Sequence, residues 1–381
     1  MAIFINKDNR IVSKNPDMQN LRKKFPVLNH CVYANTASAG LLSEDLMEWR
    51  QGHDLDFLIG GSEMKNKGFA HMPEIKKVVG KFFNCKAENV ALVPNFTLGF
   101  NLLLEGLPKD KKVLLVNKDY PSVNWPFETR GFELDHVDAD EHMEENIHAK
   151  VKKGDIDVLA LSLVQWVDGV RIDFDFLKDL KKEFPDLMIL ADGTQYCGTE
   201  PFDFEASGID ILGASAYKWM LAGYGNGFFL VKDAVMGQFE LRGIGNGSVN
   251  NDASKRNSIT FCKFLEPGHL DSLNFGSLEF TVKFLDEIGP ENVQAQLQKL
   301  SKKAMAAFTE LDLLEPSVTK RKQHSTIFNI KGDEKLFNKL TEENVVASPR
   351  GGGIRLSFHF YNTEEEIDVI ATLIKRWRSN S

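Results

Sequence analysis

The chain has 381 residues, of which 43% are hydrophobic and 26% charged, a balance typical of soluble globular proteins. This length predicts one large domain with a smaller one beside it. A formal net charge of −8 argues against a nucleic-acid or anionic-membrane surface, and no apolar run reaches the roughly 18 to 20 residues that cross a bilayer.

The N-terminus and the cysteines both favour a cytoplasmic protein. The first 20 residues lack the apolar core and the small-residue cleavage site of a signal peptide. The four cysteines are widely spaced and form no Cys-x-x-Cys pair, so we expect reduced thiols and no metal site. They are Cys31, Cys85, Cys197 and Cys262.

The first quarter of the chain predicts an extended segment and two helices. Residues 1–24 have the polar composition of a lead-in, and an extended piece with a small-residue turn follows it. Amphipathic helices are expected at 44–58 and 73–83, since their apolar residues recur at helical spacing. A strand at 90–93, a turn and a helix from about residue 98 come next, an arrangement whose free N–H groups bind anions.

Alternating strands and helices are predicted for the middle of the chain. The alternation, with a crossover helix at 176–184, predicts a doubly wound, mainly parallel sheet sandwiched by helices. A dinucleotide-binding sheet is the natural rival, but no Gly-x-Gly-x-x-Gly follows an early strand. Short apolar runs bounded by turn residues indicate buried strands at 113–116, 157–162, 187–191, 209–212 and 228–231.

Polar residues follow two of these strands, where an α/β fold places its ligands. Asp192 ends one strand, and Ser215 precedes Lys218 by three residues after the next. A carboxylate, a hydroxyl and an amine are what pyridoxal 5′-phosphate (PLP) needs for its ring nitrogen, phosphate and aldehyde. On spacing alone, a turn carboxylate, a packed serine and a surface lysine explain the same residues equally well.

The amino-acid sequence of this stretch resembles that of the class V aminotransferase family of fold-type I PLP enzymes. This family includes cysteine desulfurases, selenocysteine lyases, kynureninases and isopenicillin N epimerases. The family's Asp-Gly-Ala-Gln segment stands here as Asp-Gly-Thr-Gln at 192–195, and its Ser-x-His-Lys segment as Ser-Ala-Tyr-Lys at 215–218. The resemblance covers nearly the whole chain. It implies fold type I, with a large PLP-binding domain at 25–275 and a small C-terminal α/β domain at 276–381.

The resemblance implies roles around the cofactor ring. Lys218 would bind the aldehyde and then act as the base at Cα, and Asp192 would keep the pyridine nitrogen protonated. Gln195 would donate to the phenolic oxygen, because Trp166 replaces the asparagine of many relatives. Tyr120 would stack on the ring, where cysteine desulfurases have a histidine that can also move protons.

Other residues would hold the phosphate and line the substrate cavity. Thr97 and Ser215 are the implied phosphate ligands, although in isolation Thr97 is more often only a helix N-cap. Asn35 would line the cavity. The long segment 236–275 would reach a neighbouring active site, so the resemblance implies a homodimer with shared sites, and His269 replaces the threonine of the partner's phosphate contact.

The C-terminal segment, from Ile354 to Ile370, closely resembles the family's signature at that point. Its arginine, Arg355, would bind the α-carboxylate of an amino-acid substrate. A planar guanidinium binds a carboxylate through two parallel hydrogen bonds, whereas an isolated strand arginine is more often a surface ion-pair partner. Arg350 would add a second positive charge nearby.

One departure from the family narrows the expected reaction. Cysteine desulfurases carry a mobile-loop cysteine just before this segment, whose thiolate attacks the substrate sulfur; here no cysteine follows Cys262. We therefore expect a PLP enzyme of aminotransferase type acting on an α-amino acid, and no thiol-dependent desulfurase. Lyase or epimerase chemistry on the same cofactor is the alternative. A non-catalytic scaffold is a distant one, since it has no need for Asp192, Lys218 and Arg355 together.

Overall fold

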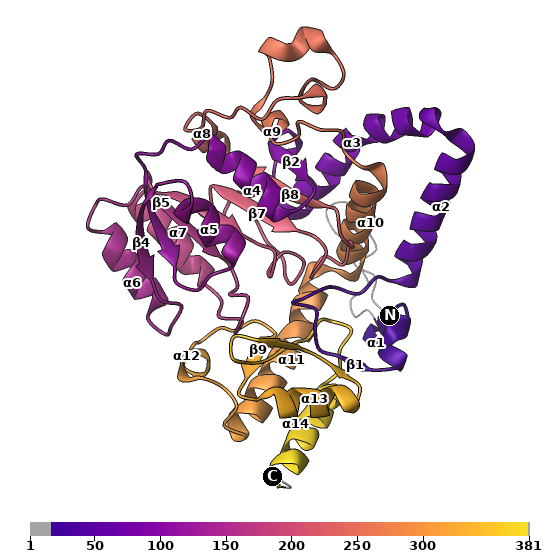
Figure 1. Ribbon diagram of the computed structural model, residues 1–381, viewed down its shortest axis with the longest axis vertical. Helices are drawn as coiled ribbons and strands as arrows, with labels where there is room; N and C mark the ends of the chain where they lie inside the picture. The colour runs from indigo at the N-terminus through magenta and orange to yellow at the C-terminus, as the bar shows by residue number, and fades with distance from the viewer. Residues whose placement is uncertain (1–16, 380–381) are drawn as a thin grey trace, which may run out of the picture.

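The computed structural model describes residues 17–379. Most of the predicted lead-in therefore lies outside the described residues. Figure 1 shows a central sheet between helices, a smaller C-terminal layer below it, and a hairpin of two long helices along one side.

The central sheet has seven strands in the order β2-β8-β7-β6-β5-β3-β4. Strand β8 is antiparallel to both of its neighbours, and the other four pairs are parallel. The predicted mainly parallel sheet is confirmed. The bounds are β2 (Val90–Val93), β3 (Lys112–Val116), β4 (Glu133–Val137), β5 (Val158–Ser162), β6 (Met188–Asp192), β7 (Ile211–Ser215) and β8 (Gly227–Val231).

Helices cover both faces of this sheet, because alternate strand residues enter two separate cores. Leu92 and Leu114 belong to one core, whereas Val93 and Leu115 belong to the other. Strands buried on both faces need continuous apolar sequence, which is why they were visible as apolar runs. The helices of this part are α4 (Phe96–Glu105), α5 (Pro121–Glu128), α6 (Met143–Val151), α7 (Phe174–Glu183) and α8 (Asp233–Met236), with the short η2 (Ala87–Asn89) before β2.

The helical hairpin consists of α2 (Glu44–Gly60) and α3 (Ser62–Phe83). The second helix was predicted to begin at Pro73, which in fact lies inside α3. Proline was taken as a start signal, but the preceding residues favour a helix and α3 packs along α10 (Ser272–Ile288), which outweighs the proline penalty. Near the hairpin turn, Leu58 and Ile59 are 80% and 86% exposed.

The C-terminal part is a three-stranded antiparallel sheet with helices against it. A separate strand of the N-terminal region, β1 (Val32–Tyr33), pairs in parallel with β10 (Val345–Val346). Residues 32–33 thus contact the C-terminal part, although the predicted division at 25 and 276 groups them with the large domain. The elements are β9 (Ile327–Ile330), β11 (Ser348–Arg350), β12 (Gly353–Ser357), α11 (Pro290–Glu310), α12 (Pro316–Thr319), α13 (Glu334–Glu342) and α14 (Glu364–Ser379).

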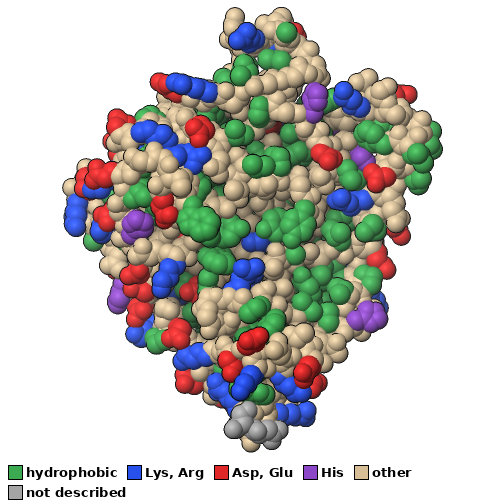
Figure 2. Space-filling model, viewed as in Figure 1, with side chains coloured by type: hydrophobic (Ala, Val, Ile, Leu, Met, Phe, Trp, Pro, Cys, Tyr) green, Lys and Arg blue, Asp and Glu red, His purple; other side chains and the backbone are tan. Residues whose placement is uncertain are grey.

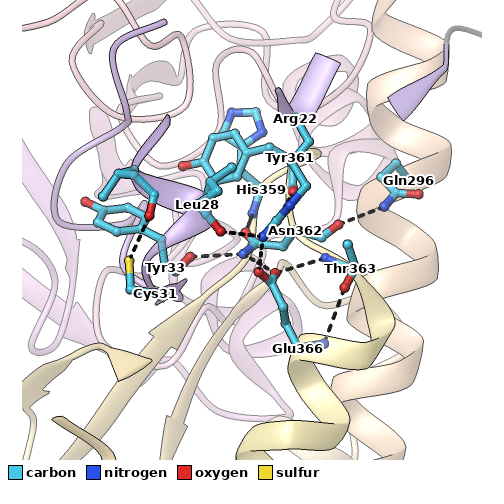
Figure 3. A network of polar contacts seen from close by, with 11 residues as sticks. Arg22, Leu28, Cys31, Tyr33, Gln296, His359, Tyr361, Asn362, Thr363 and Glu366 are labelled. Atoms are coloured by element: carbon cyan, nitrogen blue, oxygen red, sulfur yellow. Dashed lines mark hydrogen bonds and ion pairs between the residues drawn. The ribbon is translucent and has the colours of Figure 1, made fainter. Parts of the chain in front are cut away.

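A network of polar contacts fastens the N-terminal segment to this part (Figure 3). Arg22, at the end of α1 (Met18–Arg22), donates to a Glu366 carboxylate oxygen at 2.7 Å and to the Tyr361 carbonyl at 2.6 Å. Glu366 also accepts from the Asn362 amide at 2.8 Å. Asn362 in turn donates to the Tyr33 carbonyl at 3.0 Å, so helix α1 and strand β1 are tied to the start of α14.

The long segment after β8 is irregular but fixed to the sheet. Glu266, fully buried, accepts from the Leu92 N–H at 2.7 Å and pairs with Lys76 at 2.6 Å. Within the described residues, no helix is long and apolar enough to cross a membrane, and no group of three or more His, Cys, Asp and Glu could hold a metal. The remaining short helices are η1 (Pro26–Asn29), η3 (Asn246–Val249), η4 (Ala253–Asn257) and α9 (Phe261–Phe264).

Candidate active site

The candidate site lies at the carboxyl ends of the neighbouring strands β6 and β7. Asp192 is the last residue of β6, is buried, and accepts a hydrogen bond from the Thr194 N–H at 2.8 Å. Burial raises the pKa of its carboxyl to about 6, while the Thr194 hydrogen bonds and the charge of Lys218 act in the opposite direction.

Lys218 follows β7 and is buried, with its Nζ 5.5 Å from the ring centres of both Tyr120 and Tyr217. Burial lowers the pKa of this amine to about 7, and the positive charges of Arg355 and Arg350 lower it further, whereas Asp192 raises it. Among the described residues no hydrogen-bond or ion-pair partner is found for Nζ. The amine is therefore free to act as a nucleophile or base near neutral pH.

The predicted phosphate ligands lie together in one pocket. Thr97 and Ser215 both line it, together with Tyr120. The Ser215 Oγ accepts from the Phe96 N–H at 2.8 Å, which ties β7 to the first turn of α4. The N-cap of α4 is Asn95, whose Oδ1 accepts from the Leu98 N–H at 2.9 Å, so Thr97 is not the cap. The first residues of α4, Phe96, Thr97 and Leu98, line the pocket.

Both the nitrogen and the oxygen of the Gln195 side-chain amide form hydrogen bonds. Its Nε2 donates to the Ala37 carbonyl at 2.9 Å, and its Oε1 accepts from the Trp219 indole at 2.8 Å. One N–H of Gln195 remains for another acceptor. The Trp166 ring contacts the Tyr120 ring edge-on at 5.7 Å, which fixes the orientation of Tyr120 over the site.

Arg355 lies on β12 and is only 2% exposed. Its Nη1 donates to the Trp166 carbonyl at 2.7 Å, but its buried Nε has no partner. No described carboxylate lies within ion-pair distance. Burial and the Arg350 charge lower the pKa of Arg355 to about 10. A buried guanidinium without an anion is an open carboxylate site, because charged groups are rarely buried unpaired.

An isolated β-bridge brings Asn35 close to the strand that carries Arg355. Asn35 forms a parallel bridge with Ser357, two residues beyond Arg355, and its Oδ1 accepts from the Ser348 hydroxyl at 2.8 Å. Thr97, Tyr120 and Ser215 share one pocket, and the charges of Asp192 and Arg355 act on the Lys218 amine. His269 lies in a second pocket, 3.3 Å from the Asn246 amide, and does not line the Thr97 pocket.

Two functional positions were missed from the sequence. A Cβ on Gly40 would lie 2.0 Å from the Lys218 carbonyl, so this glycine permits the close approach of the N-terminal turn to the lysine segment. The Thr194 hydroxyl accepts from the Ser215 N–H at 3.0 Å and so joins the Asp192 loop to the phosphate pocket. The small-residue turn before Gly40 was the available signal, and Thr194 was marked by its departure from the family's alanine.

Comparisons with known proteins agree with this geometry. A family model described as Aminotransferase class-V matches residues 59–370. The chain belongs to the class V aminotransferase family. Its members use PLP, and PLP is therefore the cofactor of this enzyme.

Proteins similar to this chain align with almost its whole length. A probable cysteine desulfurase of Methanothermobacter thermautotrophicus is 22% identical over 94% of this chain and 97% of its own. The apo cysteine desulfurase of Thermococcus onnurineus NA1 superposes with a TM-score of 0.84 at 18% identity, covering 97% of this chain and 99% of that one. The cystine C–S lyase C-DES, in complex with its product cysteine persulfide, gives 0.80 at 18% identity, covering 92% and 98%.

The residues of this class V chain fit the cofactor. Lys218 supplies an amine that is neutral near pH 7, and Asp192 supplies the buried carboxylate beside it. The pocket at the start of α4 offers hydroxyl and backbone N–H groups to a phosphate. On the face shown in Figure 2, Lys and Arg side chains lie among hydrophobic ones near the middle of the molecule.

Proposed function

We propose that the chain is an aminotransferase-type enzyme that acts on the α-amino group of an amino acid. The observation that carries the proposal is the arrangement of an unpartnered, buried Lys218 amine between the buried Asp192 carboxylate and the unpaired Arg355 guanidinium. A scaffold protein would gain nothing from burying the Arg355 guanidinium with its Nε unpaired, which costs folding free energy.

Each residue then has one role. Asp192 holds the pyridine nitrogen in its protonated form, and Gln195 donates its remaining N–H to the phenolic oxygen. Bound PLP supplies an electron sink for bond breaking at Cα. Arg355 binds the α-carboxylate and thereby fixes which Cα bond faces Lys218, whose neutral amine accepts the Cα proton.

Tyr120 is proposed to stack on the cofactor ring rather than to move protons. Its ring centre lies 5.5 Å from the Lys218 Nζ, and the Trp166 ring contacts it edge-on. Thr97 and Ser215 bind the phosphate with their hydroxyls, and Asn35 lines the substrate side.

A C–S lyase reaction is the second candidate. Relatives named cysteine desulfurase favour sulfur chemistry and weigh against our exclusion of it. The loop before β12 has no cysteine to attack the substrate sulfur. Of the four cysteines, Cys197 and Cys262 are buried, and burial raises the thiol pKa of all four. A lyase that releases its sulfur fragment as a small molecule is compatible with this set, and C-DES is named as a cystine C–S lyase whose product is cysteine persulfide.

Reduction and mass mapping test the cofactor proposal directly. Holoenzyme treated with borohydride is expected to carry one pyridoxyl group, located on Lys218 by peptide mass spectrometry. Lys218→Ala should carry none, and Lys232→Ala, which removes another partly buried lysine, should behave as wild type. A protein that takes up no PLP, or that is labelled elsewhere, would contradict the proposal.

Product analysis separates the two reactions. Amino acids are incubated with the holoenzyme, and keto acid, ammonia and sulfide are measured in the presence and absence of an acceptor keto acid. Keto acid that forms only with the acceptor supports transamination, whereas sulfide with ammonia from cysteine or cystine supports the lyase. Persulfide on any of the four cysteines would contradict the exclusion of thiol-dependent desulfurase chemistry.

We further propose a homodimer and a cytoplasmic location. The exposed Leu58 and Ile59 at the end of α2 offer an apolar surface to a second copy, and His269, in its pocket beside Phe69, is available to a neighbouring site. The scattered reduced cysteines support the location. Sedimentation equilibrium tests the first proposal.

A further inference from the structure

Two arginines of the C-terminal part lie on one face of the same two-stranded ribbon. The antiparallel register of β11 and β12 places Ser348 opposite Arg355. Two residues further along, it places Arg350 opposite Gly353. Opposite residues, and residues two positions apart in a strand, share a face. Arg350 and Arg355 are therefore diagonal neighbours, a spacing of about 7 to 8 Å between backbones.

Arg350 reaches the mouth of the active site. Its guanidinium lies 5.8 Å from the centre of the Trp166 ring, and that ring touches Tyr120, which lies over Lys218. The positive charge of Arg350 lowers the pKa of both Lys218 and Arg355. Such an effect requires the three cations to be within electrostatic reach of one another.

The turn that presents Arg350 is fixed by its neighbours. Gly351 and Gly352 have φ values of 59° and 78°, which favour glycine. A Cβ on Gly351 would lie 2.3 Å from a Val167 methyl group, so the turn is packed closely against the large domain. The Arg350 carbonyl accepts from the Asn329 amide at 2.8 Å. The arginine is thus held in a defined position, although its side chain is exposed.

No anionic partner for Arg350 is found among residues 17–379. By contrast, the half-buried Arg130 pairs with Glu105 at 2.8 Å, and the exposed Arg242 lies 3.6 Å from Glu240. Arg350 instead stands next to a second unpaired guanidinium, and the two repel each other. An amino acid with a single carboxylate would satisfy Arg355 and leave that repulsion in place.

We infer that the substrate of this enzyme is an α-amino acid whose side chain carries a second acid group, and that Arg350 binds this group while Arg355 binds the α-carboxylate. The inference rests on the proposed function. The Trp166 ring lies 5.8 Å from the Arg350 guanidinium and 5.7 Å from the Tyr120 ring, so these rings would border the side chain of such a substrate. A dianionic ligand would also cancel the mutual repulsion of the arginines.

Binding of unreactive acids tests the inference without turnover. Glutarate and pentanoate have the same chain length but differ by one carboxylate, and their dissociation constants are measured by calorimetry on the holoenzyme. We expect wild type to bind glutarate at least tenfold more tightly, since a charge-assisted hydrogen-bonded pair contributes about that much. Arg350→Gln should remove this preference.

Two further variants serve as controls. Arg376→Gln removes the same charge from an exposed position of α14 and should keep the preference for glutarate. Arg350→Lys keeps the positive charge but lacks the planar guanidinium, so it should retain a weaker preference for glutarate. Equal binding of both acids by wild type, or a preference that survives in Arg350→Gln, would overturn the inference.

Kinetics and the labelling experiment distinguish the two proposals. If Lys218 is labelled and glutamate or aspartate reacts no faster than alanine, the function stands and the substrate class is wrong. If Lys218 takes up no PLP, the function itself fails, whatever the calorimetry shows. When both are right, Arg350→Gln lowers kcat/KM for acidic amino acids relative to that for alanine by tenfold or more.

Discussion

The pKa of the Lys218 amine depends strongly on the surroundings of this residue. A free lysine amine has a pKa of about 10.4, whereas burial brings that of Lys218 to about 7. Below this pH the amine is protonated and unreactive, and above it the amine is neutral. Reactivity should therefore rise through pH 7, well before that of an ordinary lysine.

Competitive acetylation of the apoenzyme measures this directly. Trace acetic anhydride is added at pH 5 to 11 with N-acetyl-lysine as an internal reference, and the Lys218 peptide is quantified by mass spectrometry. The expected midpoint lies near 7. In Asp192→Asn it should fall, because the carboxylate raises the lysine pKa and the amide does not. A midpoint above 9 in wild type, or an upward shift in Asp192→Asn, would contradict this account.

At the scale of elements, the site depends on the N-terminal turn that touches the lysine segment. The Gly40 N–H donates to the Tyr217 carbonyl at 2.9 Å, and any side chain at residue 40 collides with the Lys218 backbone. Gly40→Ala should therefore displace the turn and lower the free energy of unfolding by about 1–3 kcal/mol. It should also weaken PLP binding.

Gly52→Ala is the matched control, because nothing lies within 4 Å of a Cβ at this position in α2. Alanine is the better helix former, so this variant should be more stable by about 0.5–1 kcal/mol. Urea unfolding of both variants gives the comparison. Equal stabilities would show that the turn moves freely against the lysine segment.

Elements also show which parts of the fold are readable from sequence. The strands β5 to β8 are buried on both faces, so each is a short apolar run, and all were predicted within a few residues. The start of α3 was misplaced because Pro73 was taken as a boundary, although long-range packing against α10 keeps it inside the helix. Edge strand β4, half exposed and partly charged, gave no apolar run.

At the scale of the whole molecule, the parts are joined by polar contacts between distant segments. Glu366 is 9% exposed at its side chain and accepts from Arg22, Asn362 and the Thr363 N–H. Glu366→Ala would leave the Arg22 guanidinium without its carboxylate. We expect a loss of about 2–4 kcal/mol in the free energy of unfolding.

The exposed neighbour Glu365 provides the control, since its replacement by alanine should hardly change stability. Thermal unfolding followed by calorimetry compares the two variants, and the Glu366 variant should also lose the ordered attachment of α1. Hydrogen exchange of residues 18–22 reports that attachment. Unchanged exchange in Glu366→Ala would show that other contacts hold α1 in place.

The part of the candidate site whose residues lie close together in the sequence was predictable. Asp192, Ser215 and Lys218 lie within 27 residues, and the resemblance of this stretch to the family indicated a cofactor, which their spacing alone left open. A second positive charge from Arg350 was expected near Arg355, but the sequence did not show which face of the ribbon each arginine occupies. The absence of a counter-ion for either arginine depends on its neighbours in the folded structure, which a local sequence pattern does not show.

The pairing of β1 with β10 has a consequence for how the protein is made. Asn35 and its partner Ser348 are 313 residues apart in the chain. On the ribosome, the segment that lines the substrate side leaves the exit tunnel first, but its partners are translated last. The large sheet is therefore complete before the N-terminal segment has a place to bind. Nascent chains that stop before residue 345 can form the sheet around Asp192 and Lys218 but not the closed substrate pocket.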